Sequence, residues 1–133
     1  MKQYIIDTSA YSNYIIGQPG VVETLQEADV LFVNPITLAE LRAGYLSGTR
    51  TAENESRLEN FLSSPRVVQI DINPDTTRFY ATIWAGLRRA GTQIPTNDIW
   101  IAASAMQHGF TLITMDKHFE QVPQILVNRI GAR

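Results

Sequence analysis

Four acidic side chains stand where short apolar runs end or where predicted helices begin: Asp7, Glu40, Asp98 and Asp116. The first follows the run Tyr4-Ile5-Ile6 and the last follows residues 111–114, and both runs are rich in β-branched residues. Short runs of this kind are typical of buried strands. The two middle acids have apolar neighbours, which is unusual for solvated carboxylates. We therefore expect all four to meet at one edge of a sheet, where strand ends and the following helices come together.

Four ionised carboxylates in one cleft repel one another unless some are protonated or a hard cation neutralises them. The chain has no cysteine and two histidines, so oxygen atoms are the main ligands on offer. Magnesium takes oxygen ligands and is usually held by few carboxylates together with substrate phosphate, and manganese is similar. Such a cation can activate water and offset the charge that develops during phosphodiester cleavage. The four acids thus indicate a metal-dependent phosphodiesterase.

Each acid also has a purely structural explanation. These are a helix cap for Asp7, a solvated charge beside Arg42 for Glu40, a favourable helix N-terminus for Asp98 and a turn for Asp116. The functional interpretation is favoured because all four fall at the same kind of position on one scaffold.

The rest of the chain predicts an α/β scaffold. Strands are expected at residues 4–6, 30–33, 66–70, 111–114 and 125–127, and helices at 11–16, 21–28, 38–46, 51–62, 74–90 and 98–108. Asn73 is expected to cap the long helix, because Pro74 suits the first helical position. Thr96 or Asn97 is expected to cap the helix that carries Asp98. This alternation predicts a three-layer α/β/α sandwich with a mostly parallel central sheet.

The composition limits the classes of protein that the chain can be. With 133 residues and 44% hydrophobic content it can bury one core, so a single domain over residues 1–133 is expected. Its 11 basic against 13 acidic residues give no strong positive field, so RNA would have to be attracted by a local basic strip and by cations. The lack of cysteine excludes disulfides, and no apolar run approaches membrane-spanning length. We expect a cytoplasmic protein without a membrane partner.

At these residues the sequence resembles the PIN-domain nucleases and, within them, the VapC-type toxins of bacterial toxin–antitoxin pairs. The resemblance runs over nearly the whole chain and is carried by four segments in order, at residues 4–9, 36–44, 94–103 and 112–119. It implies a parallel sheet between helices, magnesium- or manganese-dependent RNA endonuclease activity, a homodimer, and a cognate antitoxin that binds near the acidic cleft. It maps the catalytic, metal-binding acids onto Asp7, Glu40, Asp98 and Asp116.

The resemblance also implies residues that support these acids. Family members use hydroxyl groups near the first and last acids and an amide near the third, which here correspond to Thr8, Ser9, Thr114 and Asn97. Side chains of this kind orient carboxylates or water. Some relatives carry a further acid two residues beyond the last aspartate, where this chain has His118. A lone histidine there is more typical of a surface or hydrogen-bonding residue than of a ligand.

Candidate RNA-binding cations and an antitoxin groove complete the sequence-based hypotheses. The cations expected around the cleft are Arg42, Arg88, Arg89 and Lys117, although the adjacent pair at 88–89 also suits an ordinary solvated helix end. By family resemblance, the RNA would be a transfer or ribosomal RNA. An apolar groove for an antitoxin helix is expected over residues 38–62, lined by Tyr45, Leu46, Leu58, Phe61 and Leu62, unless these residues close the core.

Two other functions compete with the nuclease. Asp7 ends a first strand as an aspartyl nucleophile for phosphoryl transfer does, but the second acid expected two residues later is replaced by Ser9. A module that binds RNA or protein without cutting would not need an intact set of four acids. Base stacking by Tyr11, Tyr14 or Trp100 is possible in either case, but core packing is the more common role of such residues.

Overall fold

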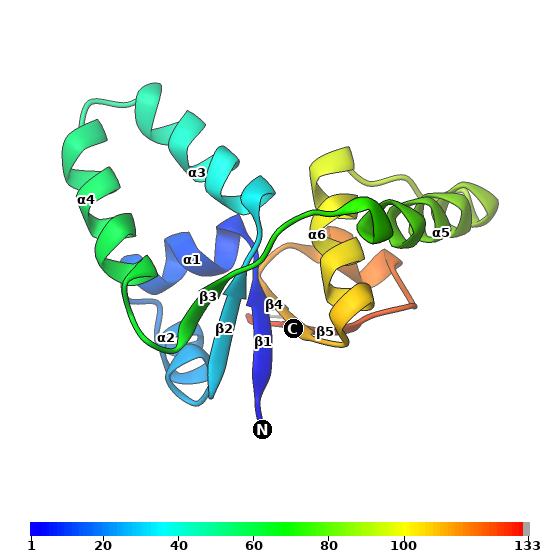
Figure 1. Cartoon of the computed structure of the whole chain (residues 1–133), viewed down its shortest axis with the longest axis horizontal. Helices are drawn as coiled ribbons and strands as arrows, with labels where there is room; N and C mark the ends of the chain where they lie inside the picture. Colours follow the sequence, from blue (N-terminus) through cyan, green and yellow to red (C-terminus); the bar gives the residue numbers. More distant parts are fainter. Residues whose placement is uncertain (132–133) are drawn as a thin grey trace.

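The computed structural model describes residues 1–131, which fold around one parallel sheet (Figure 1). In chain order its elements are β1 (Gln3–Ile6), α1 (Thr8–Ile15), α2 (Pro19–Gln26), β2 (Val30–Val33), α3 (Pro35–Leu46), α4 (Thr51–Leu62), β3 (Val67–Gln69), α5 (Pro74–Ala90), α6 (Thr96–His108), β4 (Thr111–Thr114), the 3-10 helix η1 (Lys117–Gln121) and β5 (Leu126–Arg129). None of the helices within residues 1–131 combines the length and the hydropathy that spanning a bilayer requires.

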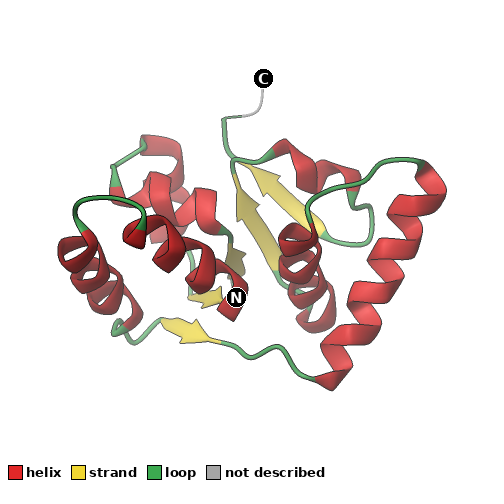
Figure 2. Cartoon of the chain, turned by 90° about the horizontal axis from the view of Figure 1, so that it is seen from above, coloured by secondary structure: helices red, strands yellow, loops and turns green. Residues whose placement is uncertain are grey.

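Helices cover both faces of the sheet, as the sequence predicted. The strand order is β3-β2-β1-β4-β5, and all neighbouring strands run parallel. Helices α1 to α4 lie on one side and α5 and α6 on the other, and the view from above shows the same two groups (Figure 2). Ile5 packs into the core beneath α5 and α6, whereas its neighbour Ile6 packs into the core beneath α1 to α4. Successive strand residues point to opposite faces, so the central strand is apolar on both.

The register of the central strands defines the site's edge. Ile6 of β1 pairs with Ile113 of β4, and the next residues along these strands are Asp7 and Thr114. The backbone N–H of Asp7 donates to the carbonyl of Ile113 across 3.5 Å. The strand ends therefore deliver a carboxylate and a hydroxyl side by side.

The predicted cap of α6 is wrong, whereas that of α5 is confirmed. Asn73 caps α5 with Pro74 in the first turn. Helix α6 begins at Thr96 after Pro95, and neither of the two predicted residues caps it within the described chain. One reason is that Pro95 occupies the N-cap position, so the helix begins one residue earlier than predicted. The other is that the Asn97 amide donates to Glu40 of α3 and is not available as a cap.

Candidate active site and metal centre

Asp7 is a buried carboxylate whose two oxygens are both occupied. It is the N-cap of α1, so Oδ1 accepts from the backbone N–H of Ala10 at 2.8 Å and from the Ser9 hydroxyl at 2.8 Å. Oδ2 accepts from the Thr114 hydroxyl at 2.6 Å. Burial raises the pKa of Asp7, and these hydrogen bonds oppose the rise. The expected cap is thus present, and the same carboxylate faces the other acids.

Glu40 is held between the starts of two helices. It lies in the second turn of α3, where its Oε1 accepts from the Thr8 hydroxyl at 2.7 Å and its Oε2 from the Asn97 amide at 3.3 Å. These donors come from the first residues of α1 and α6. Each carboxylate oxygen receives one such bond, so each retains a lone pair for a cation or water.

Asp98 is the most perturbed acid of the site. It lies in the first turn of α6 and is 9% exposed, and its Oδ2 has no hydrogen-bond partner among residues 1–131. Burial is the main cause that raises its pKa to about 6; the negative charges of Asp116, Glu40 and Asp7 add to the rise, while His118 opposes it. The four predicted acids therefore act on one another within a single electrostatic site.

Asp116 and His118 complete the cluster from η1. Oδ1 of Asp116 accepts from the backbone N–H of His118 at 2.9 Å, which caps the short helix. The His118 Nδ1 lies 3.0 Å from Oδ1 of Asp116 and 3.2 Å from Oδ2 of Asp98. The hydrogen-bonding role expected for His118 is present, but the ring is not an ordinary surface group, because it joins acids from two elements.

Hydroxyl groups connect the strand ends to the acids. The Thr114 hydroxyl donates to Asp7 and accepts from the backbone N–H of Asp116 at 2.9 Å. The Ser9 hydroxyl lies 3.3 Å from the Thr114 hydroxyl and accepts from the backbone N–H of Met115 at 3.0 Å. The family resemblance proposed four residues that support the acids, and each of them donates a hydrogen bond to Asp7 or Glu40. They are Thr8, Ser9, Asn97 and Thr114.

Asn34 is a positioning residue that the sequence reasoning missed. It is fully buried at the N-cap of α3, and its Oδ1 accepts from the backbone N–H groups of Ile36 and Thr37 at 3.0 and 3.1 Å. Its Nδ2 donates to the hydroxyl of Ser104 in α6 at 3.2 Å. Asn34 therefore fixes the helix that carries Glu40 against the helix that carries Asp98. The signal was present, since asparagine before proline also marked the start of α5.

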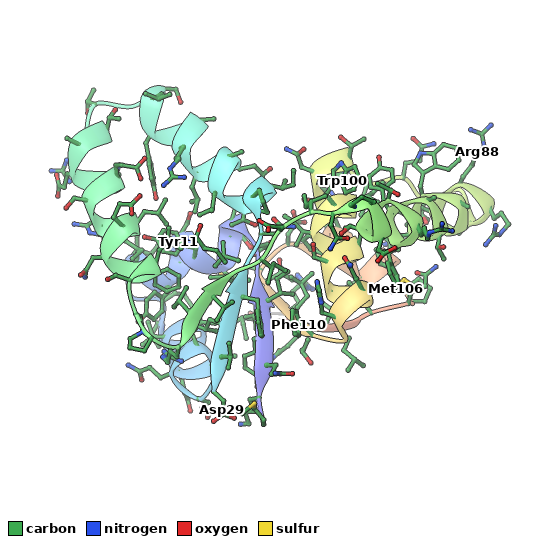
Figure 3. All side chains as sticks on the ribbon, viewed as in Figure 1. Tyr11, Asp29, Arg88, Trp100, Met106 and Phe110 are labelled. Atoms are coloured by element: carbon green, nitrogen blue, oxygen red, sulfur yellow. The ribbon has the colours of Figure 1, made fainter. Side chains whose placement is uncertain are left out.

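The predicted RNA-binding cations do not gather around the acids as a group. Arg42 pairs with Glu55 and Glu59 of α4, both at 2.9 Å, so its charge joins two helices of the same layer. Arg88 stacks on Trp84 at the outer end of α5, where Arg89 also lies (Figure 3).

Lys117 differs from these arginines because it directly follows Asp116. It is exposed and, with His118, lines a cleft of about 510 Å³ beside residues 91–94.

The candidate stacking aromatics belong to the protein's own packing. Tyr11 is 2% exposed and packs edge-on against Phe61, and Trp100 packs against Tyr80 (Figure 3). Leu58 of the expected antitoxin groove is likewise buried, whereas Leu46 is 76% exposed. Core packing, the alternative role of the groove residues, therefore applies to Leu58 but not to Leu46.

The donor set fits a divalent metal ion. Single ligand atoms of Asp98, Asp116 and His118 lie within 4.8 Å of one another among the residues that the structure describes. The buried, unpartnered Oδ2 of Asp98 is an acceptor that a cation would satisfy. Carboxylate oxygen and imidazole nitrogen are both ligands that divalent metal ions accept.

Comparisons with known proteins agree with this architecture. The PIN domain family matches residues 4–125. Ribonuclease VapC4 of Mycobacterium tuberculosis is 32% identical over 95 residues, which cover 71% of this chain and 73% of that protein. Ribonuclease VapC2 of Rickettsia felis is 30% identical over 129 residues, which cover 93% of this chain and 95% of that protein.

Solved structures extend the similarity to the fold. DNA-bound VapBC from Salmonella typhimurium matches with a TM-score of 0.86 and 26% identity, covering 97% of this chain and 98% of the matched chain. VapBC2 from Rickettsia felis, bound to a DNA fragment from its promoter, matches with a TM-score of 0.84 and 26% identity over 96% and 98%. The chain therefore belongs to the PIN-domain family, as one of its VapC-type members.

Proposed function

We propose that this protein is a divalent-metal-dependent endoribonuclease and the toxin of a toxin–antitoxin pair. The observation that carries the proposal is the convergence of Asp7, Glu40, Asp98 and Asp116 at the carboxyl edge of a parallel sheet. The similarity to ribonucleases named VapC supports RNA as substrate and hydrolysis as the reaction. Residues 1–133 would form one nuclease domain.

In this proposal the acids share the work of binding a magnesium or manganese ion. Asp98 and Asp116 hold it, and Asp7 and Glu40 complete the negative site. A bound divalent ion lowers the pKa of water and stabilises charge on the phosphate. Ser9 and Thr114 hold the Asp7 carboxylate in place. Thr8 and Asn97 donate to Glu40 and fix the plane of its carboxylate while leaving lone pairs free. Prearranged acids need little reorganisation when the substrate arrives.

The cleft beside the acids is the proposed path of the RNA strand. Lys117, His118 and residues 91–94 line it, together with Glu120, Gln121 and Arg129. A lysine at this place suits contact with backbone phosphate, which positions nucleic acid without reading its sequence. A transfer or ribosomal RNA loop remains the proposed substrate class, because single-stranded loops present splayed backbone and bases.

An antitoxin is the proposed protein partner, and a homodimer the proposed assembly. Matched structures are described as VapBC or FitAB complexes, which supports a partner of the same kind here. On this chain, a groove of about 290 Å³ between α1 and α4 is lined by apolar or aromatic side chains, Tyr14, Ile15, Phe61 and Val67, and by polar ones, Arg57, Asn60, Ser64 and Arg66. An amphipathic helix that lays its apolar side in such a groove is a common mode of recognition.

The geometry disfavours the aspartyl-phosphate alternative. A nucleophilic carboxylate needs an oxygen free to attack, whereas Asp7 is 4% exposed and hydrogen-bonded at both oxygens. Phosphate trapped covalently on Asp7 would nevertheless overturn the nuclease proposal in favour of phosphoryl transfer.

The proposal is tested by incubating antitoxin-free protein with total RNA and magnesium or manganese, then mapping new RNA ends. Cleavage should require metal, stop with a chelator, and be lost in Asp7→Asn and Asp98→Asn. Asp71→Asn, in an exposed loop before α5, is the matched control and should cut normally. Equal patterns for wild type and the site variants would mean contamination and would favour a binding module without catalysis.

A further inference from the structure

His118 lies inside the acidic cluster, although it is not among the four residues proposed to bind the metal. Its backbone is fixed by Asp116, which places the ring at the first turn of η1. From there Nδ1 approaches carboxylates of two elements, at 3.0 Å from Asp116 and 3.2 Å from Asp98. One ring nitrogen therefore faces two acids at nearly equal distance.

Hydrogen bonding satisfies only one of these two acids. A neutral imidazole carries one N–H, and here Nδ1 has hydrogen-bond geometry toward Asp116 only. The Asp98 Oδ2 is left without a partner in residues 1–131 although it is buried. Neighbouring ligand atoms around an octahedral ion lie about 3 Å apart, given bonds of about 2.1 Å. The separations of Nδ1 from the two carboxylates match this spacing.

We propose that His118 is a direct nitrogen ligand of the metal ion, together with Asp98 and Asp116, and that it makes the site prefer a first-row transition-metal ion such as Mn²⁺ over Mg²⁺. This inference rests on the metal-dependent function proposed above. It names a ligand outside the set of four acids and predicts which ion the site selects.

The preference follows from ligand chemistry. Mg²⁺ is a hard ion that binds oxygen and retains water, so replacing an oxygen ligand by imidazole weakens it. Mn²⁺ also takes oxygen ligands, but as a first-row transition-metal ion it accepts imidazole nitrogen more readily than Mg²⁺ does, and affinity for nitrogen and oxygen sites increases from Mn²⁺ onward along the series. A site of two carboxylates and one imidazole therefore discriminates against Mg²⁺ more than a site made of carboxylates alone.

The competing explanation is a hydrogen-bonded strap. In that case Nδ1 keeps a proton, His118 only links Asp98 to Asp116, and a bound ion has oxygen ligands alone. The two explanations differ in one measurable property, which is whether nitrogen is bonded to the metal.

Electron spin echo modulation of Mn²⁺ bound to the full chain tests this directly, because it detects ¹⁴N bonded to the ion. The chain has two histidines, so the only other source of an imidazole signal is His108. His108 is exposed at the end of α6 and stacks near Phe110, which makes His108→Gln the matched control. Wild type and His108→Gln should show the nitrogen modulation, and His118→Asn should lose it.

Calorimetric titration with Mn²⁺ and Mg²⁺ provides a second readout. His118→Asp puts an oxygen ligand in place of the nitrogen, so the ratio of the Mg²⁺ to the Mn²⁺ dissociation constant should fall relative to wild type. The His118 side chain is 44% exposed, so its variants should fold. Bound Mn²⁺ without nitrogen modulation, or an unchanged ratio in His118→Asp, overturns the inference but leaves the nuclease proposal standing. Failure of wild type to bind Mn²⁺ overturns the inference as well, and the RNA cleavage assay then judges the nuclease separately.

Discussion

Replacing Asp98 by asparagine should stabilise the metal-free protein at neutral pH. The pKa of this carboxyl is raised from 3.8 to about 6, mainly because it is buried. At about 1.4 kcal/mol per unit, a rise of about 2 pKa units sets an upper limit of about 3 kcal/mol on the destabilisation by ionised Asp98 at pH 7, and solvent screening lowers this amount. An amide of the same shape removes the charge, so Asp98→Asn should gain up to this amount.

The pH dependence has a definite sign. Because the folded pKa lies above the unfolded one, folded protein binds more protons between about pH 4 and 6. Wild type therefore gains stability as the pH falls through 6, whereas the amide has nothing to titrate. The advantage of Asp98→Asn should shrink to about half at pH 5. Burial, the main cause of the raised pKa of Asp7, is the same in both proteins and cancels in the difference.

The measurement is the free energy of unfolding from urea titrations at pH 7 and pH 5, in the presence of a chelator. Asp71→Asn serves as the control for an exposed aspartate and should change stability by less than about 0.5 kcal/mol. Added Mn²⁺ should stabilise wild type and leave Asp98→Asn nearly unaffected. If metal-free Asp98→Asn is less stable than wild type at pH 7, or if its advantage is the same at pH 5, burial of the Asp98 charge is not what raises this pKa.

Three further substitutions probe the supports of the site and its path for RNA. Thr114→Val removes the 2.6 Å bond to buried Asp7 and should lower the free energy of unfolding by about 1–3 kcal/mol, measured by urea titration; no loss would mean that Ser9 and Ala10 suffice. Asn34→Ala removes the α3 cap and should cost about 1–2 kcal/mol in the same assay, while Asn34→Asp should retain the cap. Lys117→Gln should weaken RNA binding at low salt and flatten its salt dependence, whereas Arg42→Gln should leave binding unchanged because that arginine is already paired.

Much of the fold was predictable because strands buried on both faces give a clear sequence signal. Residues 30–33 and 111–114 were predicted as strands with the bounds that the structure has. Parallel connections then require the strand ends to share an edge, which places Asp7 next to Thr114. The meeting of the acids follows from topology and needs no knowledge of individual side-chain contacts.

What the sequence did not predict depends on contacts between distant segments. Asn97 was expected to cap its own helix, but its amide donates to Glu40, 57 residues away. Arg42 was placed near the acids because it follows Glu40 by two residues, yet that spacing turns it to another side of α3, toward α4. The direction of His118 depends on the 3-10 geometry of η1, which periodicity does not reveal.

The structural and functional explanations of the acids are compatible, and comparing them shows which acid has the weaker structural role. Asp7 caps α1 and Asp116 caps η1, so both stabilise local structure. Asp98 is less well satisfied, because its Oδ2 is buried among negative charges and makes no hydrogen bond in the described chain, although the His118 ring lies 3.2 Å away. A buried carboxylate that lowers the stability of the metal-free protein is expected at a functional site, where a bound cation recovers the lost free energy. Asp98 is therefore the acid that a structural role explains least and a bound cation explains best.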